Sequence, residues 1–475
     1  MEEGLTLKKS LGYGLCGITQ SGVYNLVSCY MLLYLTSVAG MKTELAGTIV
    51  SFGMIMEMLS GLVIGKMSDS CTSRLGRRRP FIMASAMVFV PSIILMYSRI
   101  GGENSANMFV PYLIVSGIFW ISHSLIYVPF IAWGAEIATD YDDRTKIRSI
   151  ASFFGVAGTL LGSSCPLLFV SILEKRGMME DRAWMFMSIA VAVFSAFFLI
   201  VSMIMTRGQE QMPEDGRFRP MEALKELPLM VKDFWELMKL KTMRILLLFK
   251  ASFNLAFGLY NATMVFFLQY RLGYGDEVTS TVYTIQTIMN LFAVFLMSWL
   301  GIKLGKSTTI ILSLGLAGVG CILFYIVGIH SYFMLMVFIV MFSVAVSCFW
   351  QLSGAIFYDI TEVDEFTFGK RREGAITSLQ AAMGSLVTAL AASGFSVYMG
   401  ANGFDATLAV QSESAMRALD TLFLLVPGIA FLVACGILFL YPLNKKRFMS
   451  LQSALRLKGQ GRDYSQYEED LKKIL

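Results

Sequence analysis

Amide and aromatic side chains recur at helical spacing inside the long apolar stretches of this 475-residue chain. Amides both donate and accept hydrogen bonds, and aromatic rings stack on the apolar face of a sugar ring. The stripes hold no nucleophile beside a base, so they favour recognition of a polyhydroxylated molecule over covalent chemistry. For any one residue the alternative is a hydrogen bond between packed helices. We expect a solvated binding cavity lined by Gln20, Tyr24, Tyr127, Asn254, Asn261, Gln286, Trp350 and Gln380.

Two charged residues interrupt the apolar stretches. Glu57 lies near the middle of VSFGMIMEMLSGLVIG, beside the small residues Gly53, Ser60 and Gly61. A carboxylate at membrane depth is costly unless it is protonated, paired or bound to a cation. The sequence therefore predicts that Glu57 is the coupling site for a proton or another cation, with a structural ion pair as the alternative.

Lys250 lies inside another apolar stretch and shares a helical face with Asn254. Its side chain could extend to the cytoplasmic membrane surface. The functional alternatives are an anchor for an anionic group of the substrate and a partner for a carboxylate of the protein.

These side chains require long helices in a bilayer. Hydrophobic residues make up 56% of the chain and charged residues 15%, against roughly 45–50% and about 25% in globular proteins. A span needs ~20 apolar residues, and the runs are too long and too little alternating for strands. The prediction is an all-α membrane protein. Its twelve spans are expected at about 11–38, 44–66, 80–98, 108–133, 148–173, 184–206, 243–271, 279–302, 308–328, 331–358, 374–400 and 415–441.

Basic residues gather on one side of these spans, in the loops after the even-numbered spans and in the tail. By the positive-inside rule we expect both termini to be cytoplasmic. We expect the protein itself to lie in the cell inner membrane or plasma membrane. We expect a six-helix bundle at 1–206, a cytoplasmic linker at 207–242, a second six-helix bundle at 243–442 and a cytoplasmic tail at 443–475. Seven cysteines without a CxxC pair and only two histidines favour neither a disulfide framework nor a metal site.

Two loop motifs resemble the cytoplasmic motif of the major facilitator superfamily. SDSCTSRLGRRRP covers 68–80, and its shorter echo GIKLGKS covers 301–307, as an internal repeat would place it. Asp69, Arg77 and Arg78 would then belong to a cytoplasmic charge lock, and a plain role in topology is the alternative.

More specific segments resemble the glycoside–pentoside–hexuronide:cation symporters, a family that includes the melibiose carrier. They include VYNLVSCYMLLYLTSVAGM, VPFIAWGAEIATDYDDRTKIRS and FYDITEVDEFTFGKRREG. The resemblance implies two pseudo-symmetric bundles, with the substrate between them near the bilayer midplane. It implies sugar-site roles for Tyr30, Arg148, Trp350 and Gln380. It also implies a cytoplasmic gating loop that contains Asp359, Asp364, Glu365, Arg371 and Arg372.

The chain departs from this family at its acidic positions. No acid occurs from Gly12 to Ser28, where the family has an aspartate, and the acidic pair of helix 2 appears as Glu57 with Gly61. The family's aspartate in helix 4 is Tyr127. A sodium site of several carboxylates is thus largely absent, and the coupling ion can be H⁺ or Na⁺.

The sequence therefore predicts a secondary active transporter that moves a sugar or glycoside by alternating access. We expect no enzymatic activity, cofactor, metal site or nucleic-acid partner, and a monomer in the lipid bilayer. One alternative is a lysolipid or other amphiphile transporter of the same fold, and another is a sensor that has lost transport. A membrane-embedded enzyme is disfavoured because we expect His123 and His330 to lie on different helices without acidic neighbours.

Overall fold

The computed structural model describes residues 7–69, 71, 73, 75–102, 105–137, 141–207, 227–370, 372–405, 408, 410–460 and 462–474. Throughout this described part the chain is helical and contains no strand. Helices satisfy their own backbone hydrogen bonds, as an apolar bilayer requires. Eleven of them are long and apolar enough to cross a membrane, and the predicted all-α membrane fold is confirmed. The helix that begins at Leu7 is not among the eleven, although it forms as predicted.

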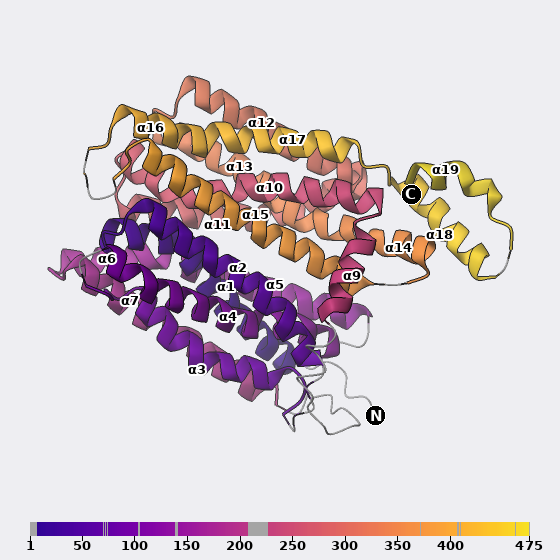
Figure 1. Ribbon diagram of the computed structural model, residues 1–475, viewed down its shortest axis with the longest axis horizontal. Coiled ribbons are helices and arrows are strands. Elements are labelled where there is room, and N and C mark those ends of the chain that lie inside the picture. The colour runs from indigo at the N-terminus through magenta and orange to yellow at the C-terminus, as the bar shows by residue number, and fades with distance from the viewer. Residues whose placement is uncertain are drawn as a thin grey trace. The chain divides into compact units, whose positions relative to one another are not determined.

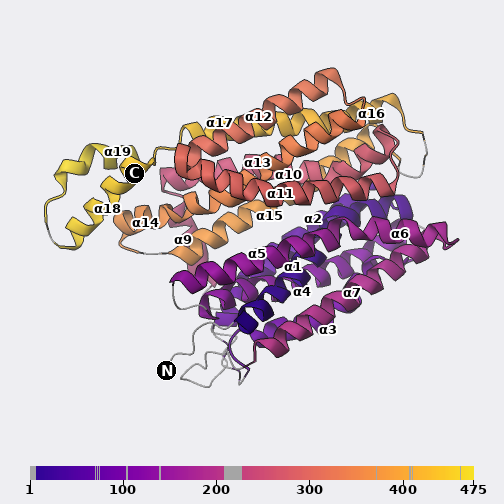
Figure 2. The same cartoon turned by 180° about the vertical axis from the view of Figure 1, so that it is seen from behind.

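The chain folds into two compact units. Unit 1 comprises the described residues within 1–226, 261–287 and 389–419. Figures 1 and 2 show its long helices running side by side. Its N-terminal helices are α1 (Leu7–Leu33) with η1 (Tyr34–Val38), α2 (Thr43–Asp69), α3 (Arg79–Met96), α4 (Ser105–Ile137), α5 (Tyr141–Ser163), α6 (Cys165–Lys175) and α7 (Glu180–Met205).

Glycines bring α1 and α5 unusually close together. A Cβ atom on Gly162 would lie 2.0 Å from the carbonyl oxygen of Gly22, and one on Gly158 would lie 2.4 Å from that of Ile18. Membrane helices commonly associate through such small residues, because they let two backbones approach. The α1–α5 contact fixes the rotation of α1 and so places its polar side chains.

Unit 1 also holds the adjoining ends of three helices from the second half of the chain. They are the end of α10 with η2 (Phe267–Arg271), the start of α11 and the end of α15, followed by α16 (Glu413–Asp420) up to residue 419. The Ser280 hydroxyl donates to the Ser164 carbonyl over 2.5 Å, and the Ser51 hydroxyl lies 2.8 Å from the Ala389 carbonyl oxygen. Lys175 and Glu277 form an ion pair. These contacts join segments far apart in the sequence into one compact unit.

Unit 2 comprises residues 227–260, 288–388 and 420–475, within the described part. The described part of the predicted linker and tail forms short helices, and α18 and α19 continue past one end of the long helices of this unit in both views (Figures 1 and 2). The helices with all or part of their length in this unit are α9 (Leu227–Leu237), α10 (Lys241–Phe266), α11 (Asp276–Leu304), α12 (Lys306–Val327), α13 (Tyr332–Tyr358), α14 (Ile360–Phe368), α15 (Glu373–Ala401), η3 (Thr421–Leu425), α17 (Val426–Phe439), α18 (Lys445–Gly459), η4 (Ser465–Tyr467) and α19 (Glu468–Ile474).

The internal repeat seen in the sequence has a counterpart in the backbone. Gly76 precedes α3 with φ 87°, and Gly305 precedes α12 with φ 91°. Both follow a leucine and precede a basic residue. A positive φ is readily adopted by glycine alone, so the two loops share a turn that other residues would strain.

Most predicted span boundaries agree with the helices to within a few residues. The main difference is in the stretch predicted at 148–173, which is divided into α5 and α6 at Ser164. Pro166 follows this break at the start of α6, where a missing backbone N–H is tolerated. The proposed division of the chain at 207–242 stays a prediction, and residues 208–226 of that linker lie outside the described part.

Candidate substrate and coupling site

Glu57 of α2 meets His123 of α4 inside unit 1. The Oε1 atom of Glu57 lies 2.8 Å from Nδ1 of His123. The imidazole is 1% exposed and the carboxylate side chain 16%. A buried carboxylate and a buried imidazole stabilise each other through this hydrogen bond. The expectation that His123 has no acidic neighbour is therefore wrong.

Serine hydroxyls fix the backbone around this pair. The Ser124 hydroxyl donates to the Glu57 carbonyl over 3.1 Å, and the Ser60 hydroxyl donates to Ser124 over 2.9 Å. Together they hold α2 against α4 at the level of the carboxylate. Ser60 and Gly61 follow Glu57 on the same helix, so the small residues noted in the sequence allow this contact.

Aromatic rings surround the imidazole. Tyr127 stacks on it with centroids 5.9 Å apart and planes 12° apart, and Phe119 stacks at 6.3 Å. Tyr24 of α1 lies at 5.5 Å, and Trp120 meets the ring edge-on at 5.7 Å. Three of these rings belong to α4 itself, and Tyr24 reaches the imidazole from α1. Two predicted cavity residues, Tyr24 and Tyr127, thus lie at the predicted coupling residue.

The other predicted residues of unit 1 differ in exposure. Gln20 is half-buried and accepts a hydrogen bond from Ser21, and Asn261 is also half-buried. Gln286 is buried, and its Oε1 atom has no hydrogen-bond partner among the described residues. Tyr30 is fully buried, and its hydroxyl donates to the Ser163 carbonyl between α1 and α5. Any contact of Tyr30 with substrate would require this packing to change.

Unit 2 carries a second polar cluster, centred on Lys250 of α10. Its ammonium donates to Oε1 of Gln380 on α15 over 3.3 Å. The same ammonium lies 6.0 Å from the ring centroid of Trp350 and 5.7 Å from that of Phe357. Lys250 is 8% exposed, and no carboxylate pairs with it among the described residues. Lys250 is therefore a buried cation stabilised by an amide oxygen and two aromatic faces.

Asn254 and Gly384 complete this cluster. Nδ2 of Asn254 donates to the Lys250 carbonyl one turn earlier, over 2.8 Å. A Cβ atom on Gly384 would lie 3.3 Å from Cε of Lys250 and 3.6 Å from Asn254. Glycine at this position leaves room beside the ammonium. Trp350 is 52% exposed, so its ring also offers a free apolar face.

The predicted gating loop forms a charge network in unit 2. The Arg372 guanidinium binds Asp364 with two hydrogen bonds, over 3.0 and 2.5 Å. It also reaches Asp233 at 2.9 Å and Glu236 at 2.6 Å, both on α9. These carboxylates raise the pKa of Arg372, with Asp364 making the largest contribution. The arginine therefore ties the linker helix to the segment between α14 and α15.

The remaining gating residues lie in more local contacts. The Arg78 guanidinium donates to the Ser68 hydroxyl over 2.6 Å, and Arg77 is half-buried. Asp359 pairs with Lys306 at 3.0 Å, and Glu365 is half-buried. Burial raises the pKa of Asp359, while Lys306 opposes that rise. Residue 371 and the side chains of residues 69 and 148 lie outside the described part, so the predicted roles of Arg371, Asp69 and Arg148 stay predictions.

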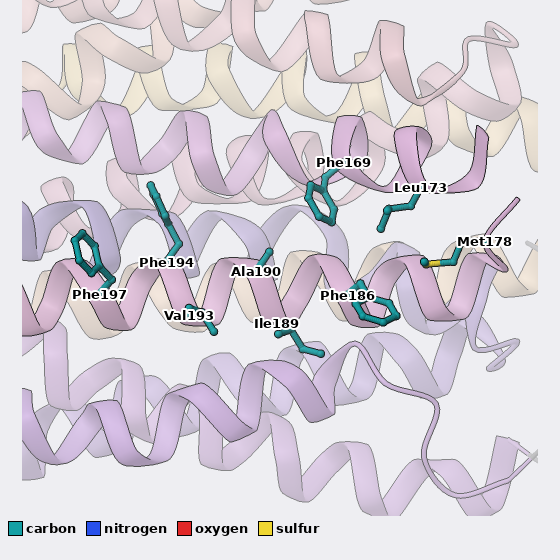
Figure 3. A pocket seen from close by; sticks show the side chains of 9 residues that line it. All are labelled: Phe169, Leu173, Met178, Phe186, Ile189, Ala190, Val193, Phe194 and Phe197. Carbon is teal, nitrogen blue, oxygen red and sulfur yellow. The ribbon is translucent and has the colours of Figure 1, made fainter. Parts of the chain in front are cut away.

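An apolar groove lies on unit 1, between α6 and α7. Figure 3 shows aromatic and aliphatic side chains from both helices along it. It is lined by Phe169, Leu173, Met178, Phe186, Ile189, Ala190, Val193, Phe194 and Phe197. The exposure of its phenylalanines is that expected of a surface against lipid acyl chains. Its lining lacks the hydrogen-bonding groups that a sugar requires.

Sequence reasoning identified Glu57 and Lys250 because a charge inside an apolar run is visible without a structure. It missed the role of His123, although His123 lies one helical turn before the predicted cavity residue Tyr127. The missing information was the partner across the helix interface. Phe357 was missed because one phenylalanine among 36 carries no signal of its own.

Comparisons with known proteins agree with this geometry. A family model described as MFS/sugar transport protein matches residues 12–445. An uncharacterised symporter of Bacillus subtilis is 24% identical over 96% of this chain and 97% of its own length. A glucuronide carrier protein homolog of Escherichia coli is 20% identical over 95% of this chain and 96% of its own length.

A solved D-xylose-proton symporter matches 91% of this chain and 96% of its own, with a TM-score of 0.62 at 14% identity. This likeness confirms the fold. The family match and the apolar spans together make the chain a multi-pass membrane protein, and the predicted family resemblance is confirmed.

Proposed function

Because this chain belongs to the MFS/sugar transport protein family, we propose that it is a secondary active transporter of an anionic sugar, of the hexuronide or glucuronide class. It works by alternating access, in which substrate and coupling ion bind with different affinity to the inward-open and outward-open states. Both termini lie on the cytoplasmic side of the inner or plasma membrane, in agreement with the distribution of basic residues among the loops. The protein acts as a monomer.

The observation that carries the choice of an anionic sugar is the environment of Lys250. A buried ammonium is costly unless a negative charge or strong acceptors compensate it. In the described residues its partners are one amide oxygen and two aromatic faces. A substrate carboxylate would supply the missing charge, while Trp350 stacks on the sugar ring and Gln380 and Asn254 bind hydroxyls. The glucuronide carrier homolog among the relatives supports the same substrate class.

Counterflow in proteoliposomes tests this proposal. The wild-type protein should exchange a radiolabelled phenyl β-glucuronide and exchange the matching phenyl β-glucoside more slowly. Lys250→Met should reduce glucuronide exchange tenfold or more, since a hydrogen bond to a charged group contributes about 1.5–3 kcal/mol, and should change glucoside exchange little.

Lys303→Met is the matched control. Lys303 lies over the Trp299 ring at 4.1 Å, at the end of α11, and is absent from the Lys250 cluster. Its substitution should leave both exchanges unchanged. If Lys250→Met exchanges the glucuronide as well as the wild-type protein does, Lys250 does not bind the substrate carboxylate. If the wild-type protein exchanges the glucoside as fast as the glucuronide, the preference for an anionic sugar is refuted.

Transport of a lysolipid is the second candidate. A sodium-dependent lysophosphatidylcholine symporter of Xenopus tropicalis is 21% identical over 95% of this chain and 90% of its own length. The apolar groove of Figure 3 is the feature that favours it. Exchange of labelled lysophosphatidylcholine without exchange of any sugar would select this candidate.

A further inference from the structure

We infer that His123 is the proton-binding residue of the coupling site and that the His123–Glu57 pair selects a proton over sodium. The inference deepens the proposed transport function and rests on it for its physiological role. Proton binding by His123 can nevertheless be measured without a transport assay.

The two nitrogens of His123 have different environments. Nδ1 lies 2.8 Å from the Glu57 carboxylate, whereas Nε2 is buried without a hydrogen-bond partner among the described residues. An ionised carboxylate is an acceptor alone, so Nδ1 must carry the hydrogen, and Nε2 then has a free lone pair. The atom that can accept a proton is therefore Nε2. A buried polar atom without a partner is otherwise costly.

Proton binding and release at Nε2 form a simple cycle. A hydronium ion transfers its proton to Nε2 and leaves as water, so that one N–H bond forms and one O–H bond breaks. The pair changes from net charge −1 to zero, while Nδ1–H continues to donate to Glu57. Transfer of the proton from Nε2 to water in the other access state restores the first form. The ring of Tyr127, stacked on the imidazole with centroids 5.9 Å apart, lies at a distance where a ring face attracts a cation.

The donor set at the pair fits sodium poorly. Hard cations are held by several oxygen ligands and compensating negative charge. α1 carries no acid, and the one acid of α4, Glu136, lies near the end of that helix. No group of three or more His, Cys, Asp or Glu side chains among the described residues could hold a metal ion. A charged imidazolium beside Glu57 would also repel a cation.

The other titratable groups at the pair are neutral in their ordinary forms. They are Tyr24 of α1 and Tyr127 of α4, and the charge of Glu57 acts on Tyr24. α3 has its one charged residue, Arg79, at its start, where Nη2 donates to the Met203 carbonyl. The groups at the pair that can change charge by binding a proton are therefore His123 and Glu57.

The chain has two histidines, which makes a direct test practical. His330 lies at the exposed start of α13 and bonds to the Val327 carbonyl. In His330→Gln protein, ¹⁵N-histidine NMR would report His123 alone. Its nitrogen signals should show protonation of Nε2 as the pH is lowered, and replacing choline chloride by sodium chloride should not change them.

The same NMR measurement on Glu57→Gln, made in the His330→Gln background, tests the role of the carboxylate. The amide cannot balance the imidazolium charge, so the titration should move to lower pH by at least about one pH unit. Glu44→Gln, a substitution at the exposed start of the same helix, should leave it in place. A His123 signal that shows no protonation of Nε2, or that shifts with sodium, would overturn the inference.

Transport separates the two proposals. If glucuronide exchange fails while His123 titrates as expected, the proposed substrate is wrong and the proton site stands. If exchange is normal but a sodium gradient drives accumulation and a pH gradient does not, the proton site is wrong. His123→Gln should lose accumulation driven by a pH gradient, and this loss should exceed any slowing of exchange.

Discussion

Glu57 and Lys250 are the two charges that the apolar spans tolerate, and the structure gives them unlike environments. Glu57 has His123 as a hydrogen-bond partner, whereas Lys250 has amide and ring neighbours and no carboxylate among the described residues. A charge that already has a partner is suited to ion coupling, because its protonation can change without leaving an isolated ion. A charge without a counter-ion is suited to binding one. The two residues thus divide coupling and substrate recognition.

Glu57→Gln separates these two roles. Without the carboxylate, the imidazolium form of His123 has no counter-ion, so the pair binds a proton more weakly. We expect accumulation driven by a proton gradient to be abolished, while counterflow exchange without a gradient continues largely intact. Both are measured with the glucuronide in the same proteoliposomes, and Glu44→Gln serves as control. Accumulation that survives Glu57→Gln would refute the coupling role.

At the scale of the helix, close packing of α1 against α5 positions the residues that α1 contributes. Gly22, Gly158 and Gly162 let the two backbones come together, and the Tyr30 hydroxyl bonds across the same interface. Tyr24 lies between these contacts and reaches His123 and Trp120 of α4. The orientation of the α1 polar stripe therefore depends on glycines that touch no substrate.

Gly162→Ala should destabilise the protein. Its Cβ would lie 2.0 Å from a backbone oxygen, so the helices must separate, and overpacking of this kind costs about 1–3 kcal/mol. Thermal unfolding in detergent should show a lower midpoint. Gly436→Ala in α17 is the control, since a Cβ atom there would have no other atom within 4 Å, and its midpoint should be unchanged or higher. Equal midpoints for the two variants would refute the packing argument.

At the scale of the whole molecule, transport requires two halves that move as bodies. The linker helix α9 belongs to unit 2, where Arg372 ties it to Asp364. The pKa of Glu236 is lowered by hydrogen bonds from Lys370 and Arg372. A lowered carboxyl pKa means that this contact is present at neutral pH and is lost as the pH falls through the lowered value. The linker should therefore move with unit 2 at physiological pH.

Arg372→Gln should release α9. Asp364 is fully buried, so removal of its partner leaves a buried charge, which costs about 3–5 kcal/mol. Hydrogen exchange should become faster in α9 and α14. Lys370→Gln is the control, because Lys370 is half exposed and its ion pair with Glu236 is of the kind that contributes about 0–1 kcal/mol. If both variants accelerate exchange equally, Arg372 is not the residue that holds the linker.

The sequence by itself determined the helical membrane architecture. A bilayer excludes unpaired backbone groups, so every span must be a long apolar helix, and such a run of residues is visible in the sequence. It also determined the importance of Glu57 and Lys250, since the cost of a charge in an apolar helix is local. Tertiary structure alone decided that His123 is the partner of Glu57, that Tyr30 is packed between α1 and α5, and that Lys250 meets Phe357. Those contacts depend on how each helix is rotated against its neighbour, and rotation is set by packing across the interface rather than by spacing along one helix.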